Sequence, residues 1–229
     1  MKVTKVSEHV RGVYTWLVFP IAVWLVKEED GVALVDGGMT TMAKGISKAI
    51  RSLGVGPLKR IVLTHGHSDH VGAIPRLLQQ WPDAPFYAHR LEIPHTTGET
   101  SYPGRKKAVR GLPVGLPRPL PEHPDGRLQP IGGLKPYWTP GHAPGHVVCH
   151  HEQDGVLLAG DLFNAKKGRL RFPLFTFDKA TALESSRIVP ELKPAHPEVC
   201  HGGPMPRPAG QLDEYLRAHA SYAGAEGQA

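Results

Sequence analysis

Apolar residues in the first third of the chain form short runs between turn signals, and this pattern predicts strands before helices. β-Branched and aromatic residues are concentrated over residues 12–19, 21–27 and 32–35, with an Asp30-Gly31 turn before the third run. Residues 60–64 read as a further short buried strand. The chain is therefore expected to begin as a β-meander that ends at Asp36.

Helical spacing of apolar positions first occurs in residues 42–53, where one face of the predicted helix is apolar. The remaining predicted helices cover residues 71–80, 89–93, 179–192 (with Asp178 as N-cap) and 209–219. The remaining predicted strands cover residues 85–88, 134–139, 146–152, 156–159 and 199–200, with an Asp154-Gly155 turn inside a hairpin. The order of strands and helices thus occurs twice along the chain.

A segment rich in proline and glycine, residues 101–126, separates the two series. It has no usable periodicity and is interpreted as a long loop, serving either as a linker or as a lid beside a pocket. We therefore expect one domain spanning residues 1–229, with two halves at about residues 1–100 and 127–229. The length of 229 residues accords with one large α/β domain.

Composition and charge exclude several classes of protein. Apolar residues make up 40% and charged residues 21% of the chain, which is ordinary for a globular fold. The net charge of +6 is spread along the chain, apart from a cluster around Arg105, Lys106 and Lys107. A nucleic-acid surface needs a denser basic stripe, so no nucleic-acid partner is expected, whereas an anionic small substrate is compatible.

The cysteine content and the N-terminus bear on location. Cys149 and Cys200 are too few for a disulfide scaffold, so a reducing cytoplasm is expected. The N-terminal residues lack a signal pattern, and Pro20 interrupts an apolar run that is too short to span a membrane. We expect a cytoplasmic protein with a small-molecule substrate and no membrane contact, while the oligomeric state stays open.

The strongest chemical signal is His65-Gly66-His67-Ser68-Asp69-His70, which follows the predicted strand 60–64. A shuffled chain of this composition would contain the pattern H-x-H-x-D-H with a probability of roughly 0.002. Neutral imidazoles and a carboxylate suit zinc, iron or manganese, and ligands this close together in a turn can serve two neighbouring ions. Turn and capping roles would explain Asp69 but not three histidines.

Two ions need further ligands, and three candidates each follow a predicted strand. They are His142, Asp161 and His201. His196 is a rival to His201, but it comes before the predicted strand 199–200, so we prefer His201. His146 is expected to begin a strand and not to bind metal. Asp36 is interpreted either as a partner that orients a ligand imidazole or as a plain turn residue.

With these residues the chain resembles the metallo-β-lactamase superfamily, over about residues 13–203. The resemblance implies an α/β fold (α+β), a four-layer αββα sandwich with a dinuclear site at one edge of the two sheets. It also implies ligands for two divalent ions, zinc first, with iron or manganese as alternatives. The implied first set is His65, His67 and His142, and the second set is Asp69, His70 and His201, with Asp161 bridging the two ions.

Two segments, residues 139–146 and 160–163, look most like the glyoxalase II-type and persulfide dioxygenase-type branches of this superfamily. Lys167 stands where those branches carry the cysteine of a Cys-Gly-Arg element, and few residues follow His201, so glutathione specificity is not expected. Class B β-lactamases are less similar, because they commonly have a cysteine in place of Asp161.

The first functional hypothesis is a metal-dependent hydrolase in which two ions share a hydroxide that attacks a thioester, lactone or related ester. Asp69 is the proposed catalytic proton carrier. The alternative is a mononuclear iron persulfide dioxygenase, because His65, His142 and Asp161 compose a two-histidine, one-carboxylate set. A second alternative is a non-catalytic metal-binding module. The proposed substrate contacts are Phe163, Asn164 and Arg169.

Overall fold

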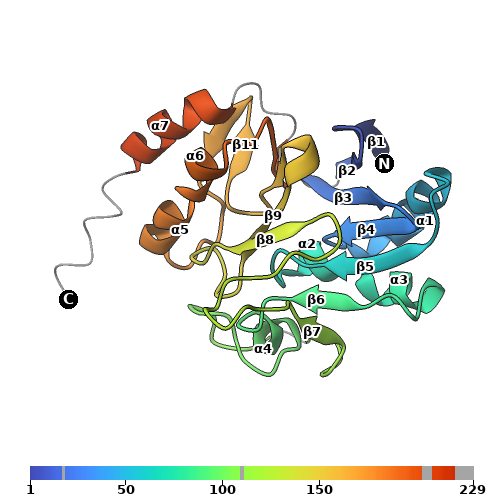
Figure 1. Cartoon of the computed structure of the whole chain (residues 1–229). Helices are drawn as coiled ribbons and strands as arrows, with labels where there is room; N and C mark the ends of the chain where they lie inside the picture. Colours follow the sequence, from blue (N-terminus) through green and yellow to red (C-terminus); the bar gives the residue numbers. More distant parts are fainter. Residues whose placement is uncertain (17–18, 109–110, 203–207, 220–229) are drawn as a thin grey trace.

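Two β-sheets lie at the centre of the fold, and helices lie on their outer sides (Figure 1). The computed structural model of the chain describes residues 1–16, 19–108, 111–202 and 208–219. Within this part, helices α1 and α3 lie beside the first sheet, and helices α5, α6 and α7 lie beside the second. The predicted α/β fold of four αββα layers is confirmed.

The first sheet has seven strands in the order β1-β2-β3-β4-β5-β6-β7. They are β1 (Lys2–Lys5), β2 (Val10–Trp16), β3 (Pro20–Glu28), β4 (Gly31–Val35), β5 (Leu58–Val62), β6 (Phe86–Ala88) and β7 (Pro117–Pro119). Neighbours from β1 to β4 pair antiparallel, and neighbours from β4 to β7 pair parallel. The parallel part begins where the connections contain helices, because parallel neighbours need a crossover.

Helices lie in the connections between the strands from β4 to β7 of the first sheet. They are η1 (Thr40–Met42), α1 (Ala43–Ser52), α2 (Ser68–Val71), α3 (Ile74–Gln80) and α4 (Ile93–Thr96).

The second sheet has the order β13-β10-β9-β8. Its strands are β8 (Lys135–Trp138), β9 (Val147–His151), β10 (Val156–Leu158) and β13 (His196–Glu198). The turn between β9 and β10 is the short helix η2 (Glu152–Asp154).

The remaining elements lie outside the two main sheets. They are the hairpin of β11 (Asn164–Lys166) and β12 (Arg169–Arg171), and the helices α5 (Lys179–Ser185), α6 (Ile188–Leu192) and α7 (Pro208–Ala218). Helix α5 begins as predicted, because the Asp178 side chain accepts a hydrogen bond of 3.0 Å from the backbone N–H of Thr181.

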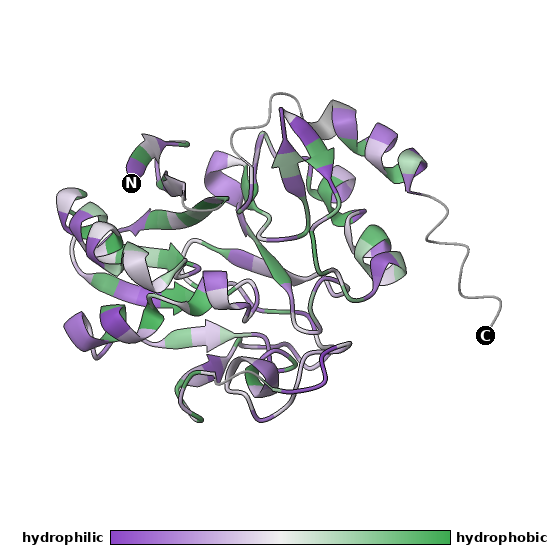
Figure 2. Cartoon of the chain, turned by 180° about the vertical axis from the view of Figure 1, so that it is seen from behind, coloured by the Kyte–Doolittle hydropathy of each residue, from purple (hydrophilic) through white to green (hydrophobic). Residues whose placement is uncertain are grey.

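Strand β9 shows why both faces of the second sheet are buried. Val147 and Cys149 belong to the apolar core that also contains Leu25 and Leu34 of the first sheet. Val148 belongs to a second core, which includes residues of α5, α6 and α7. Successive side chains of a strand point to opposite faces, so one strand supplies both cores. In Figure 2 the central strands are largely green, whereas the outer helices carry much purple.

One predicted helix is broken in two, and another begins later than predicted. The predicted helix 179–192 is α5 followed by α6, and the predicted helix 71–80 is α3, which begins only at Ile74, because α2 ends at Val71. Pro75 and Pro190, in the first turns of α3 and α6, lack the N–H that a longer continuous helix would donate to Val71 and Ser186. The short predicted helix at 89–93 was placed too early, because α4 begins only at Ile93.

Several strands also differ from the predictions. Strand β2 begins two residues earlier than predicted, and residues 17–18 of that prediction lie outside the described residues. The predicted strand 199–200 is wrong, because β13 ends at Glu198. Strands β1 and β7 and the β11–β12 hairpin were not predicted. Both β1 and β7 are edge strands, where lysine and proline are tolerated and apolar alternation is weak.

The search for membrane-spanning helices gave a negative result for the described part of the chain. No helix there is both long enough and apolar enough to cross a bilayer.

Candidate metal centre

The candidate residues come together where five strands of the two sheets end. Asp36 follows β4, His65 follows β5 by three residues, Asp161 follows β10 by three residues, and His201 follows β13 by three residues. His142 lies in the loop between β8 and β9. A rigid sheet thus positions short loops, which is a common way to present reactive side chains.

Three histidines form the first set. Nε2 of His65 lies 3.0 Å from Nδ1 of His67, and Nε2 of His142 lies 3.2 Å and 3.1 Å from these two atoms. His65 and His142 are buried, and His67 is half-buried. The three ring nitrogens converge on one point. Imidazole nitrogens are common ligands of zinc and iron.

The second set contains His70, Asp69 and His201. Nε2 of His201 lies 3.2 Å from Oδ2 of Asp69. Nε2 of His70 has no hydrogen-bond partner among the described residues, although it is buried. The thiol of the buried Cys200 also lies near His70 and His201, and its Sγ donates to the backbone oxygen of Ala22 at 3.3 Å.

Asp161 lies between the two sets. Its Oδ2 is 3.5 Å from Nε2 of His142, and its Oδ1 is 3.4 Å from Nε2 of His201 and 3.6 Å from Nε2 of His70. Oδ1 is buried and has no hydrogen-bond partner among the described residues. A buried carboxylate oxygen without a partner is costly unless another group, such as a cation, completes it.

Polar neighbours determine which nitrogen of each ring points into the site. Nδ1 of His70 donates to Oδ2 of Asp36 at 2.8 Å, and Nδ1 of His201 donates to the backbone oxygen of Pro20 at 2.9 Å. The Nε2 atoms of both rings therefore lack a proton when the rings are neutral and can act as ligands. His142 is held in the same way, with Nδ1 3.3 Å from the Thr176 hydroxyl.

Asp36 holds the imidazole ring of His70, which is one of the two roles that the sequence left open for it. Its carboxylate accepts from His70 and from both the backbone N–H and the hydroxyl of Thr64, each at 2.8 Å. The side chain is fully buried, and its backbone has a φ of 62°, which is uncommon for a residue other than glycine. Such backbone conformations are retained where the surrounding contacts impose them.

Sequence reasoning missed two residues that hold the loops of the site, the buried Glu92 and the half-buried Tyr102. Oε1 and Oε2 of Glu92 accept hydrogen bonds from the backbone N–H of Gly66 at 2.8 Å and of Gly145 at 2.7 Å. The Tyr102 hydroxyl also donates to Glu92, at 2.5 Å. Glu92 thereby ties the loop of His65 and His67 to the loop of His142. No local pattern distinguishes this glutamate from an exposed one.

His146 supports Asp161 and lies outside both sets. Its Nε2 accepts the backbone N–H of Asp161 at 3.1 Å, and its Nδ1 lies 2.9 Å from the Thr139 hydroxyl. This arrangement agrees with the expectation that His146 does not bind metal. His196 is exposed in β13 and belongs to neither set.

The pKa values of the histidines separate the two sets. Burial, together with the neighbouring imidazoles, lowers the pKa of His65 well below its usual value, that of His67 to about 3 and that of His142 to about 4. Burial acts to lower the pKa values of His70 and His201 as well, but the carboxylates of Asp36 and Asp161 beside His70, and of Asp161 and Asp69 beside His201, outweigh it, and both values rise. The first set is therefore neutral without a cation.

The two carboxylates of the site remain ionised. Burial acts to raise the pKa of Asp69, but the hydrogen bond with His201 and the charge of His70 lower it to about 2. The pKa of Asp161 is also lowered, because His70, His201 and His142 together outweigh its burial. These ionised carboxylates and the neutral imidazoles of the first set are donors that favour a divalent cation, whereas His70 and His201 bind one only after they lose the extra proton.

A cleft of about 530 Å³ opens onto the site. Part of its wall is apolar, formed by Phe19, Met39, Val71, Leu174 and Phe175. Arg105 and Tyr102, from the start of the loop 101–126, form another part of the wall. This loop therefore borders the candidate site, and it also contains β7, which extends the first sheet. Residues 109–110 of the loop lie outside the described residues.

The structure brings together only one of the three substrate contacts suggested from the sequence. Asn164 lines the cleft. Phe163 is buried in the second core, where it packs edge-on against Tyr215, and Arg169 is exposed in β12. Neither Phe163 nor Arg169 is among the residues that line the cleft. Arg169 belongs to the β11–β12 hairpin, which the sequence did not reveal.

A comparison with known protein families covers most of the candidate residues. The model of the "Metallo-beta-lactamase superfamily" matches residues 16–195, which include every candidate ligand except His201. The chain belongs to the metallo-β-lactamase superfamily. The "Probable metallo-hydrolase YybB" of Bacillus subtilis is 36% identical over 200 residues, covering 85% of this chain and 88% of the relative. Superfamily and relatives' names together indicate a metallo-hydrolase.

Two further members of the superfamily extend the comparison. The "Hydroxyacylglutathione hydrolase" of Aeromonas hydrophila is 30% identical over 150 residues, covering 65% of this chain and 49% of that enzyme. The solved metallo-β-lactamase family protein TTHA1429 from Thermus thermophilus has a TM-score of 0.70 with 24% identity, covering 93% of this chain and 80% of that one. The latter likeness supports the fold.

Proposed function

We propose that the protein is a hydrolase that uses two divalent ions, zinc first, to cleave a thioester, lactone or related ester. The observation that carries this proposal is the position of Asp161, whose two carboxylate oxygens face different histidine sets at 3.4–3.6 Å. A single ion would need only one of these sets, whereas a carboxylate between two sets suits a pair of ions.

The donor atoms fit such ions. His65, His67 and His142 would hold one ion, Asp69, His70 and His201 would hold the other, and Asp161 would contact both. The unpartnered Nε2 of His70 and Oδ1 of Asp161 would then gain the partner that they lack. Bound there, the ions would supply Lewis acidity for a carbonyl group and lower the pKa of water toward about 7.

Asp69 is suited to move a proton within this site. Its carboxylate is ionised, lies 3.2 Å from Nε2 of His201 and lines the cleft. It is therefore accessible to substrate and able to accept a proton from a nucleophile and return it to a leaving group. The thiolate leaving group of a thioester makes a modest demand on such an acid.

The cleft favours an acyl group that is apolar and carries an anionic end. Leu174 and Phe175 are 73% and 80% exposed, so they offer apolar surface at the mouth of the cleft. Arg105 supplies a guanidinium to the cleft wall, 5.9 Å from the centre of the Tyr102 ring. A carboxylate of the substrate is the natural partner of this guanidinium.

The test is a metal count followed by an activity screen. We would measure zinc, iron and manganese per chain in freshly purified protein, then assay a panel of thioesters, lactones and aryl esters. Close to two ions in this centre and turnover that Asp161→Ala abolishes would support the proposal. Asp125→Asn, at an exposed carboxylate, is the matched control. One iron per chain with oxygen uptake on a persulfide would contradict it and favour the dioxygenase.

A further inference from the structure

A second histidine and aspartate cluster lies outside the candidate metal centre. His9 precedes β2, His151 ends β9, and Asp154 ends η2. Nδ1 of His9 lies 2.8 Å from Oδ1 of Asp154, and Nδ1 of His151 lies 3.8 Å from the same oxygen. The centroids of the two imidazole rings are 5.4 Å apart. One atom from each of the three side chains therefore faces a common point.

The other oxygen of Asp154 is already used. Oδ2 accepts the backbone N–H of His9 at 2.8 Å and the Ser7 hydroxyl at 2.5 Å. These two donors orient the carboxylate and leave Oδ1 directed at the imidazoles. Metal-binding carboxylates are commonly held by hydrogen bonds of this kind to their other oxygen.

His151 supplies an independent observation. Its side chain is only 4% exposed, and its buried Nδ1 has no hydrogen-bond partner among the described residues. At 3.8 Å the contact with Asp154 is too long for a hydrogen bond. An ion pair between His9 and Asp154 would explain those two residues, but it leaves a buried nitrogen of His151 unsatisfied, at a cost of ~1–3 kcal/mol.

We propose that Nδ1 of His9, Nδ1 of His151 and Oδ1 of Asp154 bind a zinc ion or a similar divalent transition ion. Ligand atoms about 2.0–2.1 Å from a tetrahedral zinc are separated by roughly 3.3 Å. The observed separations of 2.8 Å and 3.8 Å lie on either side of this value, so small rotations of the two rings complete the set.

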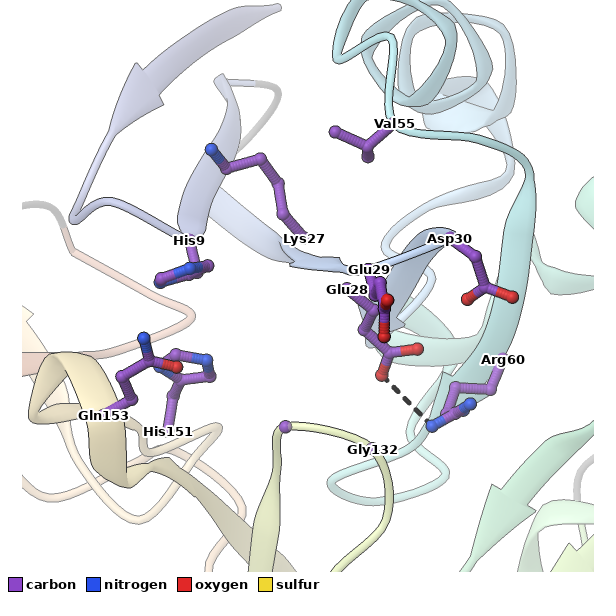
Figure 3. Close-up of a pocket in the computed structure, with 11 residues that line it drawn as sticks. His9, Lys27, Glu28, Glu29, Asp30, Val55, Arg60, Gly132, His151 and Gln153 are labelled. Carbon is purple, nitrogen blue, oxygen red and sulfur yellow. Dashed lines mark hydrogen bonds and ion pairs between the residues drawn. The ribbon is translucent and has the colours of Figure 1, made fainter.

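The cluster is open to solvent on one side. His9 and His151 line a cavity of about 560 Å³, as Figure 3 shows. Gln153 lies beside His151 and Lys27 lies beside His9 in this cavity, and Glu28, Glu29, Asp30 and Arg60 line its far side. The cavity provides a path of entry and space for water as the fourth ligand. Burial lowers the pKa of His151, which keeps its imidazole in the neutral form that binds metal.

Such an ion would join two distant parts of the chain. His9 and Asp154 are 145 residues apart, so the ion would tie the segment between β1 and β2 to the turn between β9 and β10. The role of the ion would be structural, because Asp161 and Asp69 are not among the residues that line the cavity at this site. It is also independent of the proposed hydrolase activity.

The experiment is a zinc count on the full-length protein after equilibration with excess zinc and removal of free ion. We expect His9→Ala and Asp154→Asn each to hold one zinc fewer per chain than the wild type, with unchanged hydrolase turnover. His123→Ala, at an exposed histidine of the loop before β8, is the matched control and should equal the wild type. Equal counts in all four proteins would overturn the proposal.

A second measurement needs no variant. Wild-type crystals grown with zinc should show an anomalous scattering peak at the zinc edge between His9, His151 and Asp154. If peaks occur only beside Asp161, the cluster is an ion pair alone and the proposal is wrong. This outcome is distinct from failure of the proposed function, which would appear as missing ester or thioester turnover and not as a missing peak between His9, His151 and Asp154.

Discussion

Oδ2 of Asp36 accepts a hydrogen bond of 2.8 Å from Nδ1 of His70, and neither side chain is exposed to solvent. This contact fixes the ring of His70 so that its unpartnered Nε2 faces Oδ1 of Asp161. A residue at the end of β4 thereby controls a nitrogen that lies 34 positions later in the chain. The position of Asp36 therefore determines which nitrogen of this imidazole faces Asp161.

We expect Asp36→Asn to reduce metal affinity or turnover by about 10- to 100-fold, the usual effect of removing a carboxylate that orients a ligand histidine. The amide keeps the size of the side chain but accepts only at one oxygen, so Thr64 and His70 can no longer both be satisfied. Metal content and kcat/KM test this expectation. Asp30→Asn, at an exposed carboxylate that pairs with Lys59, is the control, and equal losses in both variants would refute it.

Glu92→Gln should loosen both histidine loops. The glutamine side chain has one acceptor oxygen, whereas three donors bond to the two carboxylate oxygens of Glu92 in the structure. Burying an unsatisfied N–H costs ~1–3 kcal/mol. We expect a lower Tm together with lower kcat, measured by thermal unfolding and by steady-state kinetics. Tyr102→Phe removes one of the three bonds and should have the smaller effect. If Tyr102→Phe proves the more damaging, the bond to Glu92 is not what matters.

Metal removal should destabilise the protein, because the convergent ring nitrogens and the carboxylate of Asp161 lose their common partner. A ligand at about 1,000 times its Kd stabilises by ~4.1 kcal/mol, which corresponds to roughly 8–16 °C for a chain of this size. Thermal unfolding with and without a chelator measures the shift. The shift should shrink in Asp161→Ala, and a chelator without effect on the wild type would contradict the expectation.

The stability of the fold should fall between pH 6.5 and pH 4, in part through His89. This buried side chain stacks on Trp138, with the ring planes 3° from parallel, and burial lowers its pKa to about 4. Over this interval the unfolded chain binds a proton here that the native state does not. The contribution of neutral His89 to the free energy of unfolding is therefore present above pH 6.5 and is lost as the pH falls toward 4.

The variant His89→Phe keeps the stacking on Trp138 and removes the titration. Its Tm should decline less steeply than that of the wild type over the same interval, while His123→Phe, at an exposed position, should follow the wild type. Parallel curves for all three proteins would show that His89 does not titrate as its burial requires.

Arg105→Ala should raise KM for substrates with a carboxylate by about tenfold, which is ~1.4 kcal/mol of binding, and leave kcat nearly unchanged. The physical reason is the loss of a charge-assisted hydrogen bond at the wall of the cleft. Lys107→Ala, at a neighbouring exposed cation outside the cleft wall, is the control. A fall in kcat without a change in KM would place Arg105 in the chemistry and contradict this expectation.

The sequence by itself determined the elements and residues whose signals are local. Apolar, β-branched runs between turn residues predicted β3, β4 and β10, and the spacing H-x-H-x-D-H predicted the loop that carries three histidines. The candidates His142 and Asp161 each follow a predicted strand that the structure contains, whereas His201 was chosen for the predicted strand 199–200 and instead follows β13. These features depend on neighbours within a few positions, so one sequence suffices to recognise them.

Only the tertiary structure decided which long-range contacts complete the site. Glu92 joins Gly66 to Gly145, His146 supports Asp161, and Arg105 rather than Arg169 borders the cleft. The His9, His151 and Asp154 cluster likewise joins two distant segments of the chain that share no motif. In each case packing of the two sheets brings distant residues together, and burial changes their pKa values and hydrogen-bonding needs. A pattern along the chain carries no information about either effect.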